Sequence, residues 1–299
     1  MAYGTPGSEQ DMEPYLTDIR RGRKPSQEAV DRLKERYRKI GGHSPLLEIT
    51  NAQASALETQ LRARGLDTRT YVGMKHWHPY IREVVPRIMS DGFERIVALV
   101  LAPHYSQISI GGYKQGLDQS LTSAEKVNVA FIESWYDNPL FHSAVAERIA
   151  RGLSHFPEPG KVQVLFTAHS LPERILEQKD PYPTQLLDSC KAIAQLAKLE
   201  RWSFAYQSAG ETGEKWLGPD ILDALQEISL HQGSAVLVVP IGFVADHLEI
   251  LYDIDIEAQE FAKLHGLNLR RTESLNADPK FISALSDVIA KRVSLNHRA

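Results

Sequence analysis

The residues best suited to chemistry are acidic side chains that follow the apolar run 235–239 in the C-terminal third of the chain. They are Asp246, Glu249, Asp253, Glu257 and Glu260. At about 100° per residue, an α-helix over this segment would place all of them within roughly 80° of one face. Carboxylates crowded on one stripe repel one another, and a bound cation or proton relieves that repulsion. The spacing therefore predicts a cation site.

A solvated helix face is the alternative interpretation, because amphipathic helices normally turn their charges to water. Charge alone does not separate the two. Apolar residues border the acidic stripe, with Ile250 and Phe261 on one side and Leu248, Tyr252 and Ile256 on the other. A narrow charged strip of this kind fits the lining of a cleft better than an open surface. Ligands of open α/β sheets also bind beyond the carboxyl ends of strands, where this segment would lie.

A second candidate site is the segment 165–173, which reads as a strand that ends in His169 and turns directly into a helix. Ser170 and Glu173 match a capping box, with Pro172 in the first turn. The positive end of that helix would disfavour an added proton on the imidazole. A histidine hydrogen-bonded to backbone is the alternative for His169 alone. Together, His169 and Glu249 at two strand ends predict proton transfer and binding of a divalent cation such as iron(II).

Aromatic and basic residues suggest a flat, anionic ligand. Trp216 offers a broad apolar wall, and Tyr3, Tyr37 and Tyr113 are other possible lining groups, although aromatic residues more often belong to the core. The basic segment 20–24 suits carboxylates or phosphates, because guanidinium groups bind planar oxyanions through two hydrogen bonds. A solvated loop is the alternative for that segment.

The composition limits the class of protein. A chain of 299 residues with 42% hydrophobic residues favours two domains. The net charge of −4 gives no general attraction to nucleic acid or to anionic membranes. Cys190 is the only cysteine, which excludes an internal disulfide and predicts a reducing, cytoplasmic location. No segment reads as a transmembrane helix or an export signal.

The pattern of elements predicts an α/β fold with parallel sheets flanked by helices. Strands are expected at 70–72, 96–101, 127–132, 162–167, 203–206 and 235–240, and helices at 79–90, 141–153, 182–199, 219–231 and 279–293. Prolines and a glycine in 154–160 interrupt the pattern. We therefore expect an N-terminal domain over 1–156 and a C-terminal domain over 157–299. The sequence does not decide on which half the final helix packs.

These motifs together resemble the ferrochelatases, which insert iron(II) into a porphyrin during haem synthesis. The matching blocks are residues 2–6, 41–46, 101–106, 168–172, 206–208, 216–220 and 240–257. They span nearly the whole chain, and the histidine block, the W-x-G-P-D block and the acidic segment are highly specific in combination. Within the family, the blocks 19–25, 102–104 and 133–136 look most like the soluble form that acts on coproporphyrin III.

The resemblance implies two Rossmann-like domains that enclose a porphyrin cleft. It implies that His169 and Glu249 are catalytic and bind iron, with Tyr3 approaching the metal from the other porphyrin face. Asp253 and Glu257 would form a path for protons or metal leading from Glu249. Residues matching positions that contact the porphyrin are Tyr3, Arg20, Arg36, Tyr37, Ser44, Tyr113 and Trp216. Iron(II) would be a substrate, and no cofactor would be permanently bound.

The resemblance further implies a monomer with no integral membrane contact and a transient contact with another enzyme of the haem pathway. Alternatives are a protoporphyrin IX ferrochelatase, a related chelatase for cobalt or nickel, and a non-enzymatic carrier of porphyrin or metal. In the relatives, several apolar residues forming the first strand precede the tyrosine block, whereas here Met1 directly precedes Ala2 and Tyr3. We therefore expect much of that strand to be absent and Tyr3 to be held less firmly.

Overall fold

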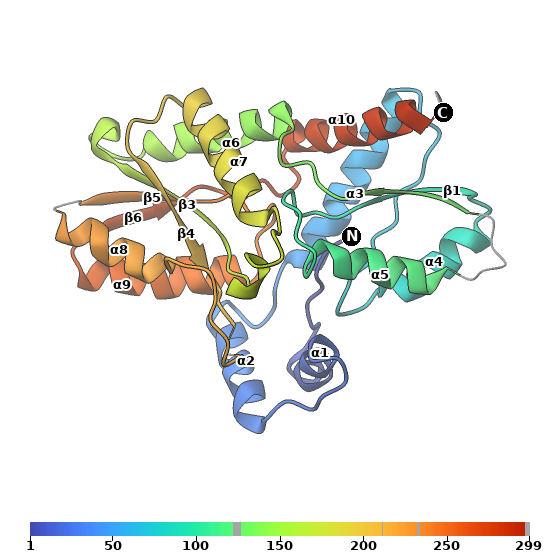
Figure 1. Ribbon diagram of the computed structural model, residues 1–299, viewed down its shortest axis with the longest axis horizontal. Helices are drawn as coiled ribbons and strands as arrows, with labels where there is room; N and C mark the ends of the chain where they lie inside the picture. Colours follow the sequence, from blue (N-terminus) through green and yellow to red (C-terminus); the bar gives the residue numbers. More distant parts are fainter. Residues whose placement is uncertain (122–126, 211, 232–233, 297–299) are drawn as a thin grey trace. The chain divides into compact units, whose positions relative to one another are not determined.

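The computed structural model describes residues 1–121, 127–210, 212–231 and 234–296 (Figure 1). Contacts between Cα atoms divide the chain into two compact units. The first unit comprises Met1–Trp135, Ala245–Leu248 and Asn276–Ala299, and the second comprises Tyr136–Val244 and Glu249–Leu275. Each unit has a parallel sheet accompanied by helices, which confirms the predicted α/β class.

The sheet of the first unit pairs β1 (Arg95–Leu99) with β2 (Asn128–Ile132) in parallel. The first residue of the chain lies beside the end of β1. The Met1 amino group donates to the Leu99 carbonyl at 2.7 Å, and the Met1 carbonyl accepts from the Leu101 amide at 2.9 Å. Ala2 forms a parallel bridge with Met74. The strand predicted at 70–72 is wrong, since only isolated bridges at Met74 form in this region.

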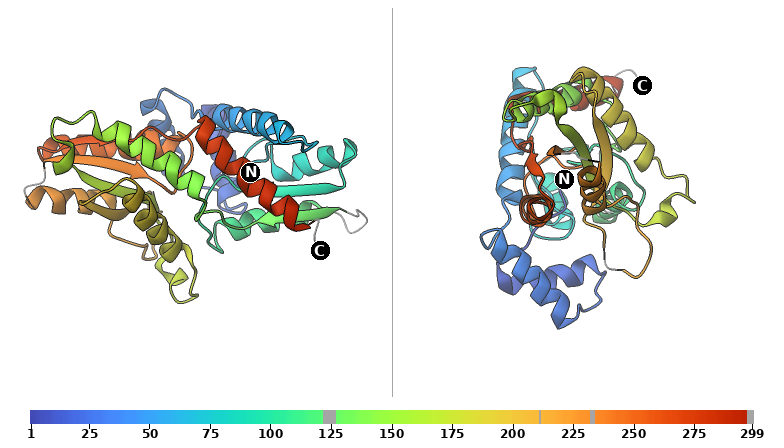
Figure 2. Two further views of the ribbon diagram at one scale, coloured as in Figure 1. Left: turned by 90° about the horizontal axis from the view of Figure 1, so that it is seen from above. Right: turned by 90° about the vertical axis from the view of Figure 1, so that its left-hand side faces the viewer.

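The helices of the first unit are η1 (Glu9–Asp11), α1 (Met12–Ile19), α2 (Gln27–Lys39), α3 (Leu46–Ala63), α4 (Ile81–Ser90), α5 (Ile110–Ser120) and α10 (Pro279–Asn296). Helix α2 begins where the Ser26 hydroxyl accepts from the Ala29 amide, and basic residues complement the dipole in its last turn. The final helix was predicted, but the half on which it packs was left open. Helix α10 packs on α3 and β1, and Figure 2 shows it (red) beside α3 (light blue). The Gln60 amide donates to Ser283 at 2.7 Å across this contact.

The sheet of the second unit has the order β4-β3-β5-β6 with all pairs parallel. Its strands are β3 (Gln163–His169), β4 (Trp202–Gln207), β5 (Ala235–Pro240) and β6 (Asn268–Arg271). Strands β1 to β5 all lie where the sequence predicted strands. The edge strand β6 was missed, because Leu269 is its only buried residue and gives no apolar run.

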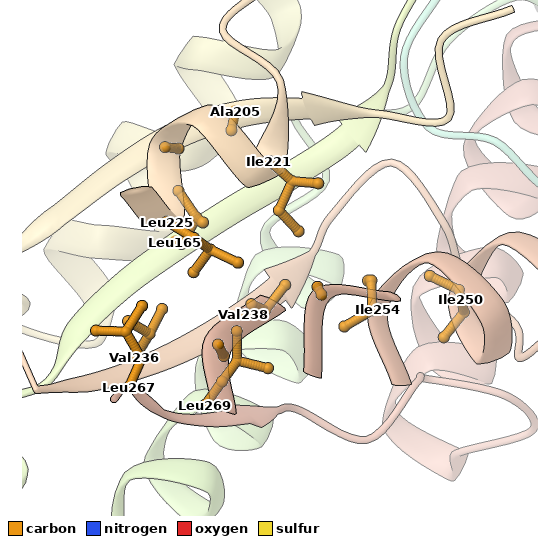
Figure 3. Close-up of a cluster of buried hydrophobic side chains, with 13 residues drawn as sticks. Leu165, Ala205, Ile221, Leu225, Val236, Val238, Ile250, Ile254, Leu267 and Leu269 are labelled. Carbon is orange, nitrogen blue, oxygen red and sulfur yellow. The ribbon is translucent and has the colours of Figure 1, made fainter. Parts of the chain in front are cut away.

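Helices cover both faces of this sheet. They are α6 (Pro139–Leu153), α7 (Tyr182–Leu196), α8 (Ile221–Leu230) and α9 (Gln259–Leu264), together with the short η2 (Pro159–Lys161) and η3 (Glu173–Ile175). In Figure 1, α6 and α7 lie on one side and α8 and α9 on the other. The buried cluster in Figure 3 joins Leu165 of β3 and Val238 of β5 to Leu225 of α8 and to Ile254 of the helical segment that precedes α9.

The acidic segment does not form the predicted α-helix. Its backbone is a π-helix, η4 (Ile250–Ala258), which continues into α9. Asp246 lies before this helix and exchanges two 2.9 Å hydrogen bonds with Asn276 in the first unit. A π-helix has i→i+5 hydrogen bonds and a wider turn, so the spacing of 100° per residue does not apply. The carboxylates consequently differ in burial: Asp253 is only 4% exposed, whereas Glu257 is exposed.

The two units do not follow the predicted halves of the chain in detail. Helix α6, which the sequence places before the boundary at 156/157, packs on α7 and β5 of the second unit. The predicted domains 1–156 and 157–299 stay a prediction, because contacts do not test whether either part folds alone. Among the described residues, none of the helices combines the length and the apolar character needed to cross a bilayer.

Candidate functional site

His169 and Glu249 lie together at the carboxyl edge of the sheet in the second unit. His169 is the last residue of β3, and Glu249 directly precedes η4, which follows the loop after β5. The His169 Nε2 atom is 3.5 Å from Glu249 Oε1, and the two side chains are 32% and 26% exposed. The structure therefore brings together the pair that the sequence predicted from two separate strand ends, with both groups accessible to a ligand.

Backbone contacts fix the orientation of the His169 ring. Its Nδ1 atom is hydrogen-bonded to the Ser170 carbonyl, which leaves Nε2 as the nitrogen that faces Glu249. The Tyr182 hydroxyl donates to the His169 carbonyl at 2.9 Å. Gly242 allows the turn after β5 to approach β3 closely, because a Cβ atom there would lie 2.7 Å from the Ala168 Cβ. This close approach positions the segment that leads to Glu249.

The electrostatic state of His169 is opposite to the prediction. Burial lowers the pKa of His169, but the Glu249 carboxylate, the Ser170 carbonyl and the Asp253 carboxylate together raise this pKa to about 9. The predicted capping box is also wrong: Ser170 donates instead to the Leu217 carbonyl at 2.8 Å, and the following helix η3 is a single short turn. At neutral pH the metal-free pair is therefore an imidazolium beside a carboxylate, and a metal ion must displace the imidazole proton.

Two aromatic rings flank the imidazole. The ring centroids of Trp216 and Phe243 lie 6.3 and 6.4 Å from that of His169. The Trp216 indole donates to Thr212 Oγ1 at 3.0 Å and packs against Gly210, where a Cβ atom would come within 2.5 Å of Cζ2. The sequence predicted Trp216 as an apolar surface for a flat ligand, but it did not predict Phe243, because a single aromatic residue in a turn gives no periodic signal.

The residues that end β4 contact the backbone or side chains of the acidic segment. The Gln207 amide donates to the Glu249 carbonyl at 3.3 Å. Ser208, which has a φ of 59°, donates from its hydroxyl to the Asp253 carboxylate. Glu257, the outer member of the predicted path, is exposed. The types and spacing of Gln207 and Ser208 in the sequence did not predict that they contact the acidic segment.

The remaining predicted site residues lie in the first unit. Tyr3 is 41% exposed and its ring lies 4.7 Å from that of His76. Arg20 is exposed at the end of α1, and Arg36 is half-buried in α2. Three others are buried, namely Tyr37, Ser44 and Tyr113. The Tyr37 hydroxyl is hydrogen-bonded to Thr5 at 2.7 Å.

A basic group near these residues was missed by the sequence. Lys75 Nζ lies 5.0 Å from the centre of the Tyr113 ring and donates to the Ser109 carbonyl at 3.4 Å. Burial, assisted by the positive charge of Arg21, lowers the pKa of Lys75 to about 8. A buried cation here favours an anionic ligand, since a nearby negative charge would raise the pKa of Lys75 back towards its usual value. A lone lysine has no motif by which it could be recognised.

Within the part of the chain that the structure describes, three or more His, Cys, Asp or Glu side chains do not gather into a metal-holding group. The pair of His169 and Glu249 would leave most coordination positions of an ion open. Catalytic metal sites retain open positions, whereas structural sites are closed by protein ligands.

Comparison with known proteins identifies the family. The ferrochelatase family model matches residues 1–293. A ferrochelatase of Herpetosiphon aurantiacus is 47% identical over 97% of this chain and 96% of its own length. A coproporphyrin III ferrochelatase of Geobacillus thermodenitrificans is 44% identical over 98% and 95%, and that of Bacillus subtilis is 41% identical over 98% and 96%. The chain belongs to the ferrochelatase family, which confirms the predicted class of lyase that inserts iron(II) into a porphyrin in haem synthesis.

Two solved structures of other proteins have a similar fold. SirB from Bacillus subtilis with Fe3+ has a TM-score of 0.56 and 12% identity, covering 80% of this chain and 88% of that one. CbiX, described as the terminal enzyme for biosynthesis of sirohaem in denitrifying bacteria, has a TM-score of 0.55 and 10% identity, covering 83% and 93%. At such low identity these likenesses show the shared fold alone.

Proposed function

We propose that coproporphyrin III is the porphyrin that this ferrochelatase metallates, with His169 and Glu249 as the catalytic residues of the iron site. The observation that carries the assignment of the catalytic pair is the 3.5 Å approach of His169 Nε2 to Glu249 Oε1 beside the Trp216 ring. Several relatives at 41–44% identity are coproporphyrin III ferrochelatases. Coproporphyrin carries four propionates, and the basic segment 20–24 and Lys75 have the charge to bind carboxylates.

The reaction exchanges one iron(II) ion for two pyrrole protons of the free-base porphyrin. Glu249 accepts the two pyrrole protons in turn and releases the first before it takes the second, and His169, whose own proton leaves to solvent, binds the incoming ion through Nε2. Asp253 and Glu257 would carry protons or metal between Glu249 and the protein surface. Trp216 and Phe243 would hold the macrocycle in a bent form that exposes the nitrogen lone pairs, because a flat ring keeps them in its plane.

The roles of residues in the first unit rest on the family resemblance and are proposed with it. We assign Tyr3 to the iron site and to porphyrin binding. We assign Arg20, Arg36, Tyr37, Ser44 and Tyr113 to porphyrin recognition. The two arginines suit the propionates, since guanidinium groups bind carboxylates through paired hydrogen bonds. No resident cofactor is proposed, because iron(II) is consumed as substrate.

A cytoplasmic location, a monomeric state and a transient contact with another haem-pathway enzyme are further proposals. The single buried cysteine, Cys190, supports a reducing compartment. Cell fractionation would test the location, and sedimentation analysis would test the monomer. Cross-linking in extracts with and without the porphyrin product would test the contact.

The substrate is tested by anaerobic incubation of the full chain with iron(II) and either coproporphyrin III or protoporphyrin IX. The expected result is a higher kcat/KM for coproporphyrin III, measured from the absorbance change between free base and metalloporphyrin. An equal or higher kcat/KM for protoporphyrin IX would contradict the assignment. Arg20→Gln should raise the KM for coproporphyrin III and leave that for iron(II) unchanged. Arg69→Gln, at an arginine paired with Asp91, is the matched control.

A further inference from the structure

We infer that Gln207 is a positioning residue that holds the Glu249 carboxylate against His169. This inference rests on the proposed function, because it concerns how the proposed iron site is built. Gln207 is the last residue of β4 and lies directly opposite His169 in the parallel register of β3 and β4. Its side chain is completely buried, so it acts through protein groups and does not contact bulk solvent.

The amide of Gln207 is oriented by the Glu249 backbone. Its Nε2 atom donates to the Glu249 carbonyl at 3.3 Å. The reversed orientation would place the amide oxygen against a carbonyl oxygen, where neither atom could donate, so the hydrogen bond itself assigns the nitrogen. The hydrogen bond joins the end of β4 to the residue that precedes η4. The Ser170 amide donates to the Gln207 carbonyl at 2.7 Å, so Gln207 is hydrogen-bonded both to Glu249 and to the residue that follows His169.

The oxygen atom of the Gln207 amide supports the role of the nitrogen as the donor. Among the described residues, Gln207 Oε1 is one of the buried side-chain oxygens that have no hydrogen-bond partner. A buried acceptor without a donor destabilises a fold, whereas an apolar side chain at the same place would carry no such cost. The hydrogen bond that its nitrogen donates to the Glu249 carbonyl is therefore the contribution that distinguishes this amide from an apolar side chain of the same shape.

The neighbouring residue extends the same arrangement. Ser208 donates to the Asp253 carboxylate, so consecutive residues at the end of β4 contact the two residues that bear the inner carboxylates. Ser208 has a positive φ, which turns its side chain away from the regular alternation of the strand. The end of β4 thus fixes the spacing between Glu249 and Asp253 along the start of the π-helix.

The test uses Gln207→Met, which keeps the length of the side chain and removes both amide groups. Cobalt(II) binding to the metal-free full chain is measured by calorimetry, and iron(II) insertion is measured anaerobically. We expect cobalt affinity to fall and the KM for iron(II) to rise by about tenfold, as is typical for residues that orient metal ligands. The dissociation constant for coproporphyrin III should not change. Gln207→Asn keeps the amide but shortens its reach, and it should behave in the same way.

Thr167→Val is the matched control. Thr167 is also fully buried with an unpartnered oxygen, and it precedes His169 by two residues on the same face of β3. It should bind cobalt as the wild type does. A thermal unfolding curve for each variant establishes that it is folded. If Thr167→Val weakens cobalt binding as much as Gln207→Met, a general effect of core disturbance replaces the positioning role.

A double-mutant cycle with Glu249→Gln separates this inference from the proposed function. If Gln207 acts through Glu249, then Gln207→Met has no further effect on cobalt binding in the Glu249→Gln background. Additive losses would overturn the inference. Wild-type cobalt binding by Glu249→Gln would instead refute the iron-site assignment. Weak binding by Glu249→Gln together with wild-type binding by Gln207→Met would overturn the positioning role alone.

Discussion

Replacement of Glu249 by glutamine should reverse the protonation state of His169 in the metal-free protein at neutral pH. In the wild type, the pKa of His169 is raised from 6.5 to about 9 despite the opposing effect of burial, chiefly because Glu249 lies 3.5 Å from Nε2. Without that carboxylate, burial becomes the dominant influence. We therefore expect the pKa of His169 to fall to about 6.5 or lower in Glu249→Gln.

The same shift predicts a pH-dependent stability. A group whose pKa is higher in the folded than in the unfolded chain stabilises the fold fully below its unfolded pKa of 6.5, and this contribution is lost as pH rises through about 9. The full shift would correspond to about 3 kcal/mol at roughly 1.4 kcal/mol per pKa unit. Because His169 is 32% exposed, solvent screening reduces this, and we expect about 1–2 kcal/mol.

The assay is a titration of the histidine ring protons by NMR between about pH 5 and 10, with His169→Ala to assign the signal. Denaturant unfolding of wild type and Glu249→Gln at the two ends of the 6.5–9 window measures the stability difference. A pKa for His169 that stays above about 8 in Glu249→Gln would refute the reasoning, because Glu249 would then not be the main cause of the raised value. Cobalt affinity of the wild type should also rise with pH up to about 9, as the competing proton leaves.

Three other predictions follow from the geometry. His169→Ala should abolish iron insertion while coproporphyrin III binding is retained, and a near-normal insertion rate would remove His169 from the catalytic site. Gly242→Ala should lower the free energy of unfolding by about 1–3 kcal/mol, because its Cβ would lie 2.7 Å from that of Ala168; Gly160→Ala, which meets open space, should be close to neutral in the same denaturation assay. Ser26→Ala should destabilise α2 by about 1 kcal/mol through loss of its N-cap, and an unchanged denaturation midpoint would argue against that cap.

The fold class could be read from the sequence because the strands of parallel sheets are buried on both faces. Strands β3 and β5 are rich in apolar residues and buried along nearly their whole length, and each lies where it was predicted. The edge strand β6 has one buried residue and one neighbouring strand, so the same rule misses it. The segment 70–72 has strand-like residues but no partner that would make it a strand. Pairing, not composition, decides both cases.

The placement of His169 at a strand end was also predictable, since an apolar strand must stop at its first polar, turn-forming residues. The local interpretation of the next residues failed. Serine is a residue type that commonly caps helices, yet the Ser170 hydroxyl donates to the carbonyl of Leu217, which is distant in the sequence. A cap requires only local contacts, so a sequence pattern finds the possibility but does not reveal a tertiary acceptor that competes for the hydroxyl.

The sequence by itself determined the residue types of the site, the α/β class and, through its motifs, the ferrochelatase family. The tertiary structure decided what those residues experience. The carboxylates expected on one α-helical stripe lie along a π-helix, with Asp253 buried against Ser208 and Glu257 in solvent. The charge of His169 likewise depends on Glu249 from another part of the chain. Electrostatic interaction and burial depend on distance in space, which spacing along the sequence does not supply.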